Sequence, residues 1–169
     1  MNVIFLDFDG VLDTIHYNSD EDVERKIKIL ADICKEYDCK IVIEASAKDA
    51  IDEETLEPSG RWLNFIFDMF KKYGIECIGR TPTISKKINE FSTIPIWKEL
   101  EILEYLKMHP EIKHYCVIDD DDLGPRNSDL NLVRDHLVTP LYYSEENPEE
   151  EGLLLSHKEL VGEILKKSR

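Results

Sequence analysis

The feature that most constrains the fold of this chain is a short apolar segment that runs directly into two carboxylates. Within the sequence "NVIFLDFDGVLDT", residues 3–6 are continuously apolar, as expected for a strand buried on both faces of a sheet. Asp7 ends this segment, Asp9 follows two positions later, and Gly10 permits a sharp change of direction. Two acids at the end of a core strand are costly to bury, so their presence indicates a chemical purpose.

Helix-like and strand-like segments alternate along the rest of the chain. This alternation predicts the α/β class, specifically a three-layer α/β/α sandwich with a mostly parallel sheet. A chain of 169 residues suits one domain, so we assign residues 1–169 to a single unit. Ser19 and Asp22 form a candidate capping box at the start of the first helix. We predict helices near residues 20–37, 61–73, 97–108 and 156–167, and further strands near residues 40–44, 75–78, 114–118 and 137–138.

The composition argues against several classes of partner. The formal net charge is −15, from 36 acidic and 21 basic residues, and such a surface repels phosphodiester backbones and anionic lipids. We therefore expect no nucleic-acid partner and no membrane association. The four cysteines are scattered, and we interpret them as reduced thiols of a cytoplasmic protein. The acidic segment at residues 145–151 is most simply a solvated loop.

A second group of acids follows another predicted strand. In "CVIDDDD", Asp119 and Asp120 come directly after an apolar run. The carboxyl ends of parallel strands meet at one edge of a sheet, so these acids converge with Asp7 and Asp9 if the two strands are neighbours. Two like charges near 4 Å repel by about 4 kcal/mol at an effective dielectric of about 20.

A hard divalent cation relieves such repulsion, and Mg²⁺ prefers oxygen ligands. The acidic residues therefore predict a magnesium site. Within the first pair, one carboxylate can attack a phosphorus centre as a nucleophile while the other transfers the proton to the leaving group.

These segments resemble the motifs of the haloacid dehalogenase (HAD) superfamily. "DFDGVLD" is similar to its first motif, DxDGxxD, "VIDDDD" is similar to its fourth, and Lys98 in "IWKELEILEYL" fits its basic position. The resemblance implies a Rossmannoid fold and Mg²⁺-dependent hydrolysis of a phosphomonoester through an aspartyl-phosphate. It makes Asp7 the nucleophile and a metal ligand, and Asp9 the acid/base and a ligand through its backbone carbonyl. Asp119 or Asp120 completes the metal site, and Lys98 holds the phosphate.

Family members often cover the active site with an inserted cap domain. The short spacing between Asp13 and Lys40 leaves no room for a cap after the first motif. Residues 47–97 leave room only for a minimal cap or loop region. We therefore expect a small, capless member of the phosphatase type with a rather open site, which accepts a phosphorylated substrate whose identity the residues do not specify.

The second motif of the family departs from its usual pattern. In "KIVIEASAK", Glu44 stands where a hydroxyl residue is expected first, and Ser46 lies two positions later on the same side of an extended chain. In one register, Ser46 donates a hydrogen bond to the phosphate. In the other, Glu44 faces the phosphate and repels it. The second register predicts a catalytically weak or inactive phosphate-binding or regulatory domain, and the sequence leaves both open.

Two other kinds of protein also cluster acidic residues at strand ends. A receiver domain of a two-component system expects an aspartate at the end of a middle strand, and neither the second nor the third predicted strand ends in one. A Toprim-type nucleotidyl site would use Glu44 as a lone acid together with the later aspartates. The net charge and the early "DFDG" argue against it.

Overall fold

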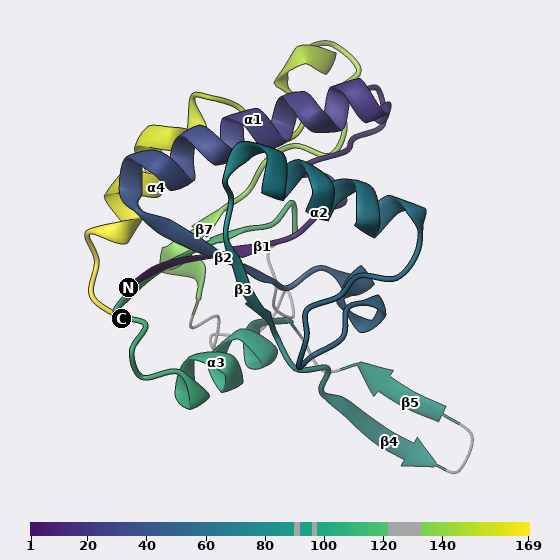
Figure 1. Cartoon of the computed structure of the whole chain (residues 1–169), viewed down its shortest axis with the longest axis vertical. Helices are drawn as coiled ribbons and strands as arrows, with labels where there is room; N and C mark the ends of the chain where they lie inside the picture. Colours follow the sequence, from purple (N-terminus) through teal and green to yellow (C-terminus); the bar gives the residue numbers. More distant parts are fainter. Residues whose placement is uncertain (90–91, 96–97, 122–132) are drawn as a thin grey trace.

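A computed structural model describes residues 1–89, 92–95, 98–121 and 133–169, with only the backbone described for residues 85–89 and 92–95. Five parallel strands form the central sheet in the order β3-β2-β1-β6-β7, so the first strand of the chain is the middle strand of the sheet (Figure 1). The strands are β1 (Asn2–Leu6), β2 (Cys39–Ile43), β3 (Cys77–Arg80), β6 (His114–Ile118) and β7 (Leu137–Val138).

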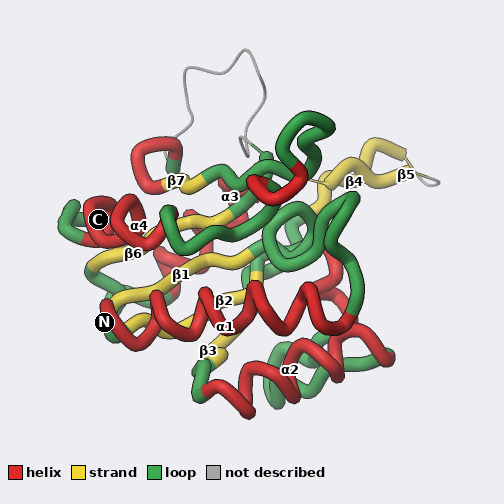
Figure 2. The backbone as a smooth tube through the Cα atoms, turned by 90° about the horizontal axis from the view of Figure 1, so that it is seen from above, coloured by secondary structure: helices red, strands yellow, loops and turns green. Residues whose placement is uncertain are grey.

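Helices cover both faces of this sheet. On one face lie α1 (Asp20–Tyr37), α2 (Arg61–Tyr73) and α4 (His157–Leu165), and on the other lies α3 (Lys98–Met108) (Figure 1). Seen from above, the five strands run side by side between these layers (Figure 2). The predicted three-layer α/β/α sandwich with a parallel sheet is confirmed.

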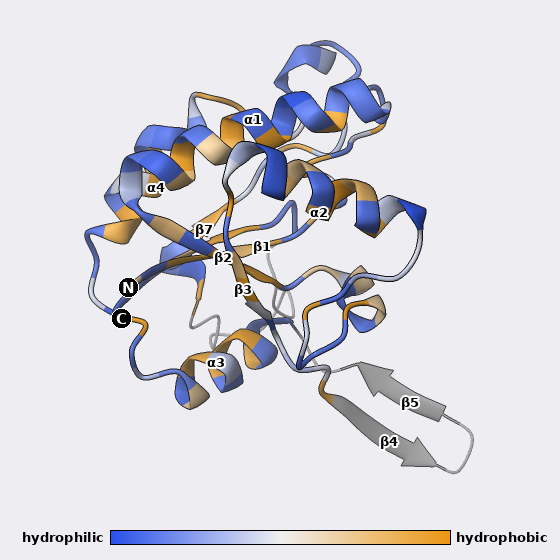
Figure 3. Ribbon diagram, viewed as in Figure 1, coloured by the Kyte–Doolittle hydropathy of each residue, from blue (hydrophilic) through white to orange (hydrophobic). Residues whose placement is uncertain are grey.

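The core has two halves because successive side chains of a buried strand point to opposite faces. In β1, Ile4 and Leu6 join the cluster under α1, α2 and α4, whereas Val3 and Phe5 join the cluster under α3. All four side chains are fully buried. The hydropathy colouring shows the same division, with apolar residues on the strands and inner helix faces and hydrophilic residues outside (Figure 3).

The helix boundaries follow the predicted signals closely. Ser19 and Asp22 form the capping box of α1, and Gly74 ends α2 with a left-handed conformation. Strand β3 begins at Cys77, two residues later than predicted, and α4 ends at Leu165. Trp97, where we expected the third helix to begin, lies outside the described residues.

An antiparallel hairpin was not predicted. Strands β4 (Ser85–Asn89) and β5 (Ser92–Pro95) pair with each other and project from the body of the molecule (Figure 1). The hairpin lies within residues 47–97, where we expected at most a minimal cap. No large cap is present in the described part of the chain. Nor do the described residues include a helix long and apolar enough to cross a bilayer.

Candidate active site

The strands β2, β1 and β6 pair in a register that brings their last residues side by side. Leu6, the last residue of β1, pairs with Ile43 of β2 on one side and with Ile118 of β6 on the other. The next residue of each strand therefore lies in one row at the carboxyl edge of the sheet. The backbone N–H of Asp7 continues the ladder by donating to the carbonyl of Ile118 at 3.0 Å.

This row consists of three acids, Asp7, Glu44 and Asp119. Side chains alternate along each strand, so these three continue the face that Phe5 presents to α3. Lys98 is the first residue of α3, and its ammonium group meets all three carboxylates. Its Nζ lies 2.7 Å from Asp119 Oδ2, 3.3 Å from Asp7 Oδ1 and 3.7 Å from Glu44 Oε2.

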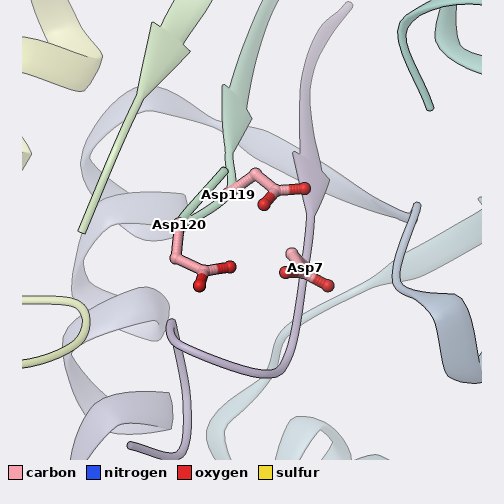
Figure 4. Close-up of side chains that lie close together, drawn as sticks. All are labelled: Asp7, Asp119 and Asp120. Carbon is pink, nitrogen blue, oxygen red and sulfur yellow. The ribbon is translucent and has the colours of Figure 1, made fainter. Parts of the chain in front are cut away.

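Asp120 brings a further carboxylate to the same place. Asp7, Asp119 and Asp120 each offer an oxygen atom, and the three atoms lie within 4.8 Å of one another (Figure 4). Asp7 and Asp119 are buried, while Asp120 is partly exposed. Three carboxylate oxygens are the donor set that a hard cation such as Mg²⁺ prefers, so these residues fit the predicted metal.

Gly10 allows the loop after β1 to pass close to this cluster. Its φ is +78°, and a Cβ at this position would lie 2.4 Å from Asp120 Cγ. Only glycine combines this conformation with this close approach. The glycine of "DFDG" therefore lets the chain turn directly beside the proposed metal ligands.

The carboxyl groups of the cluster do not all stay ionised without a cation. Burial raises the pKa of Asp7 to about 8, and the neighbouring Asp119 carboxylate adds to the shift. Burial also raises the pKa of Glu44 well above its ordinary value, again with Asp119 contributing. Burial alone would lower the pKa of Lys98, but the Glu44, Asp119 and Asp7 carboxylates raise it, so this side chain stays cationic.

The structure places Glu44, and not Ser46, in the acidic cluster. Glu44 is 1 % exposed, and its carboxyl group lies against the carboxyl group of Asp119 and the ammonium group of Lys98. Ser46 is exposed at the start of a short 3-10 helix, η1 (Ser46–Ala50). The backbone turns into η1 soon after β2 ends, so Ser46 does not lie on the extension of the strand, where it would share a face with Glu44.

The side chain of Asp9 lies outside the cluster. Asp9 is exposed and forms an isolated bridge with Asp13. Burial and the nearby Asp9 carboxylate raise the pKa of Asp13 to about 7. The Asp9 carboxyl group therefore lies beside that of Asp13 and outside the three-aspartate group, and this placement is compatible with a metal contact through the Asp9 backbone carbonyl.

Two residues near the site were missed by sequence reasoning. Lys48 of η1 is buried, donates to Thr81 Oγ1 at 3.0 Å and forms an ion pair with Glu101 of α3. Glu151 is fully buried, so the prediction of a solvated loop at residues 145–151 is wrong for this residue. Both lie in polar segments without apolar periodicity, which is why no pattern distinguished them from exposed charges.

Comparison with models of known protein families shows which family the chain belongs to. A family model described as the HAD domain in Swiss Army Knife RNA repair proteins matches residues 3–142. The chain belongs to the HAD family. The match spans both acidic segments and Lys98, and membership in this family supports a phosphatase-like hydrolase in general terms. Comparisons of this HAD domain with curated proteins and with solved structures gave no significant match.

Proposed function

We propose that this HAD domain is a Mg²⁺-dependent phosphomonoester hydrolase that works through an aspartyl-phosphate on Asp7. The observation that carries the proposal is the convergence of Asp7, Asp119 and Asp120 beside Lys98 at the carboxyl edge of the sheet. A bound Mg²⁺ would neutralise phosphoryl oxygens, which otherwise repel an attacking carboxylate. Asp7, Asp119, Asp120 and the backbone carbonyl of Asp9 would hold this ion.

The side chains divide the chemistry between them. The Asp7 carboxylate forms a bond to phosphorus as the ester P–O bond breaks, and a proton from Asp9 passes to the departing oxygen. Asp9 then takes a proton from the water molecule that attacks the aspartyl-phosphate, which releases phosphate and regenerates Asp7. Lys98 binds a phosphoryl oxygen and keeps the Asp7 carboxylate in place through their 3.3 Å contact.

Glu44 supports the alternative of a catalytically weak or inactive phosphate-binding or regulatory domain. It brings a buried carboxyl group to the position of the usual hydroxyl donor, 3.7 Å from the Lys98 ammonium that serves the phosphate. Mg²⁺ bound at the neighbouring aspartates would favour the ionised form of Glu44, and this additional unit charge about 5 Å away opposes an anionic substrate by about 3 kcal/mol at an effective dielectric of about 20, or on the order of 100-fold in binding. We therefore expect hydrolysis to be slow.

Hydrolysis of p-nitrophenyl phosphate tests the proposal. We expect turnover with Mg²⁺, none with EDTA, and a loss of at least about 1000-fold in Asp7→Asn, because the amide is not a nucleophile. Asp68→Asn, which changes an exposed acid on α2, is the matched control and should leave the rate unchanged. Turnover that survives EDTA or Asp7→Asn would refute the mechanism. Specific phosphate binding without turnover would favour the regulatory alternative.

For the substrate, we propose a small phosphorylated molecule. The net charge of −15 disfavours nucleic acid, whereas the family description, which names RNA repair proteins, favours a phosphorylated RNA end. Rates on a sugar phosphate and on oligoribonucleotides with a 5′- or a 3′-phosphate distinguish these two candidates. A cytoplasmic location is part of the proposal, since the four free cysteines suit a reducing compartment.

A further inference from the structure

The loop that carries Asp9 is packed against a segment from the far end of the chain. Residues 8–19 follow β1, and residues 151–153 lie directly beside them. The backbone N–H of Leu153 donates to the carbonyl of Val11 at 2.8 Å. A Cβ on Gly152, whose φ is +73°, would lie 2.9 Å from the same carbonyl oxygen. The two segments are therefore in backbone contact, with no space for a side chain between them.

Glu151 is the centre of this contact. Its side chain has no exposed surface, and its hydrogen-bond donors come from the loop after β1 and from Ser144. Its carboxylate accepts hydrogen bonds from the backbone N–H of His16 at 3.1 Å and from that of Ser144 at 2.9 Å. His16 Nδ1 lies 2.6 Å from the second carboxylate oxygen, and the Thr14 side chain is a further hydrogen-bond partner.

The backbone of Glu151 is anchored as well. Its carbonyl oxygen accepts a hydrogen bond from the buried ammonium group of Lys26, on α1, at 2.6 Å. Burial alone would raise the pKa of the Glu151 carboxyl, but the donors from Ser144, His16 and Thr14 lower it to about 2. Glu151 is thus ionised, and its hydrogen bonds connect residues 151–153 with α1, with the loop after β1 and with Ser144.

A chain of contacts connects Glu151 with Asp9. Thr14 is next to Asp13 in the chain, and the carbonyl of Asp13 accepts a hydrogen bond from the N–H of Gly10 at 2.8 Å. Asp9 itself bridges to Asp13. We propose that Glu151 is a positioning residue for the proton transfer by Asp9. This inference rests on the proposed function and extends it to a residue that contacts neither the substrate nor the proposed metal.

The proposal makes a specific kinetic prediction because proton transfer matters most for poor leaving groups. p-Nitrophenolate departs without much help from an acid, whereas an alkoxide requires a well-placed proton donor, and general acid catalysis contributes roughly 100- to 10,000-fold. Misplacement of a catalytic group by about 1 Å reduces rates on the order of 100-fold. A displaced Asp9 should therefore slow hydrolysis of an alkyl phosphate far more than hydrolysis of p-nitrophenyl phosphate.

The experiment compares Glu151→Gln with Glu150→Gln, a change in the exposed neighbouring residue, on p-nitrophenyl phosphate and glycerol 2-phosphate. For Glu151→Gln, we expect kcat/KM, which reports formation of the aspartyl-phosphate and not its hydrolysis, to fall about 30-fold on the alkyl phosphate and about 3-fold on the aryl phosphate. His16→Ala should shift the ratio in the same direction by a smaller factor. Glu150→Gln should leave both rates unchanged.

The ratio of kcat/KM for glycerol 2-phosphate to kcat/KM for p-nitrophenyl phosphate distinguishes a positioning role of Glu151 from a purely structural one. Partial unfolding of a variant reduces both rates equally, so it leaves the ratio unchanged. An unchanged ratio in Glu151→Gln and His16→Ala, with an active wild-type protein, overturns the positioning role and leaves the proposed function intact. Absence of turnover of both substrates by the wild-type protein overturns the proposed function, and the positioning role with it.

Discussion

At the scale of single residues, Glu44 decides how this site differs from a typical member of its family. The pairing of β1 with β2 places Glu44 beside Asp7, and its buried carboxyl group meets Lys98 at 3.7 Å. With Asp7, Asp119 and Asp120, the described residues bring four carboxyl groups and one ammonium group to the site. A bound divalent cation would favour the ionised forms of these carboxyl groups, and one such ion does not neutralise all four, so an anionic substrate would meet residual negative charge.

Replacement of Glu44 should therefore increase activity. We expect Glu44→Gln, which keeps the shape and removes the ionisable group, to raise kcat/KM for p-nitrophenyl phosphate about 10- to 100-fold. Glu44→Thr, which introduces the family's usual hydroxyl, should act in the same direction. Glu54→Gln changes an exposed glutamate and serves as the control. A decrease in kcat/KM in both Glu44 variants would mean that this carboxyl group assists the reaction.

At the scale of elements, a buried ion pair fixes α3, which carries Lys98, relative to the sheet. Lys48 of η1 bonds to Thr81 after β3 and pairs with Glu101 of α3, and Glu101 Oε1 accepts from the backbone N–H of Ile84 at 3.1 Å. Three segments that follow β2, β3 and the hairpin therefore meet at one polar contact. Both charged side chains are almost fully buried, so each requires the other.

Breaking this pair should be strongly destabilising. We expect Lys48→Met to lower the free energy of unfolding by about 3–5 kcal/mol, because it leaves the Glu101 carboxylate buried without its cation. Lys48→Met with Glu101→Leu should recover most of the loss. Urea denaturation followed by circular dichroism measures both. The surface pair of Lys40 and Glu76 is the control, and Lys40→Met should change stability by less than about 1 kcal/mol.

At the scale of the whole molecule, the strand order concentrates negative charge at one edge of the fold. Because β1 lies between β2 and β6, the acids that follow all three strands meet at a single point. The folded protein must hold these groups together, whereas the unfolded chain keeps them apart in water. Stability should therefore depend on pH and on a divalent cation.

Thermal unfolding in EDTA should show this dependence. The pKa of Asp7 rises from 3.8 to about 8 on folding, so the folded state binds a proton that the unfolded state releases. The resulting stabilisation is complete below pH 3.8 and is lost as pH rises toward 8. We expect Tm in EDTA to fall between pH 6 and 8.5, and millimolar Mg²⁺ to restore it at the upper end.

Asp7→Asn is the control for this experiment, since it removes the titrating group. Its Tm should vary less with pH and should respond less to Mg²⁺ than that of the wild-type protein. A wild-type Tm in EDTA that stays constant or increases across this range would contradict the linkage between the acidic cluster and folding.

The sequence by itself indicated the α/β class, most helix boundaries and the convergence of Asp7, Asp119 and Asp120 at the sheet edge. These features depend on local signals, namely the apolar strand segments, the capping box at Ser19 and the position of acids at strand ends. The resemblance of "DFDGVLD" and "VIDDDD" to HAD motifs added the family, which the match over residues 3–142 confirms.

Only the tertiary structure decided which residues of the second motif face the cluster and which distant residues support the site. The sequence left Glu44 and Ser46 as alternatives because strand periodicity puts both on one side. The turn into η1 after β2 separates them. Glu151 and Lys48 resemble surface charges in the sequence, since their partners are far away along the chain. Burial and hydrogen bonding between such residues arise only when the segments pack together.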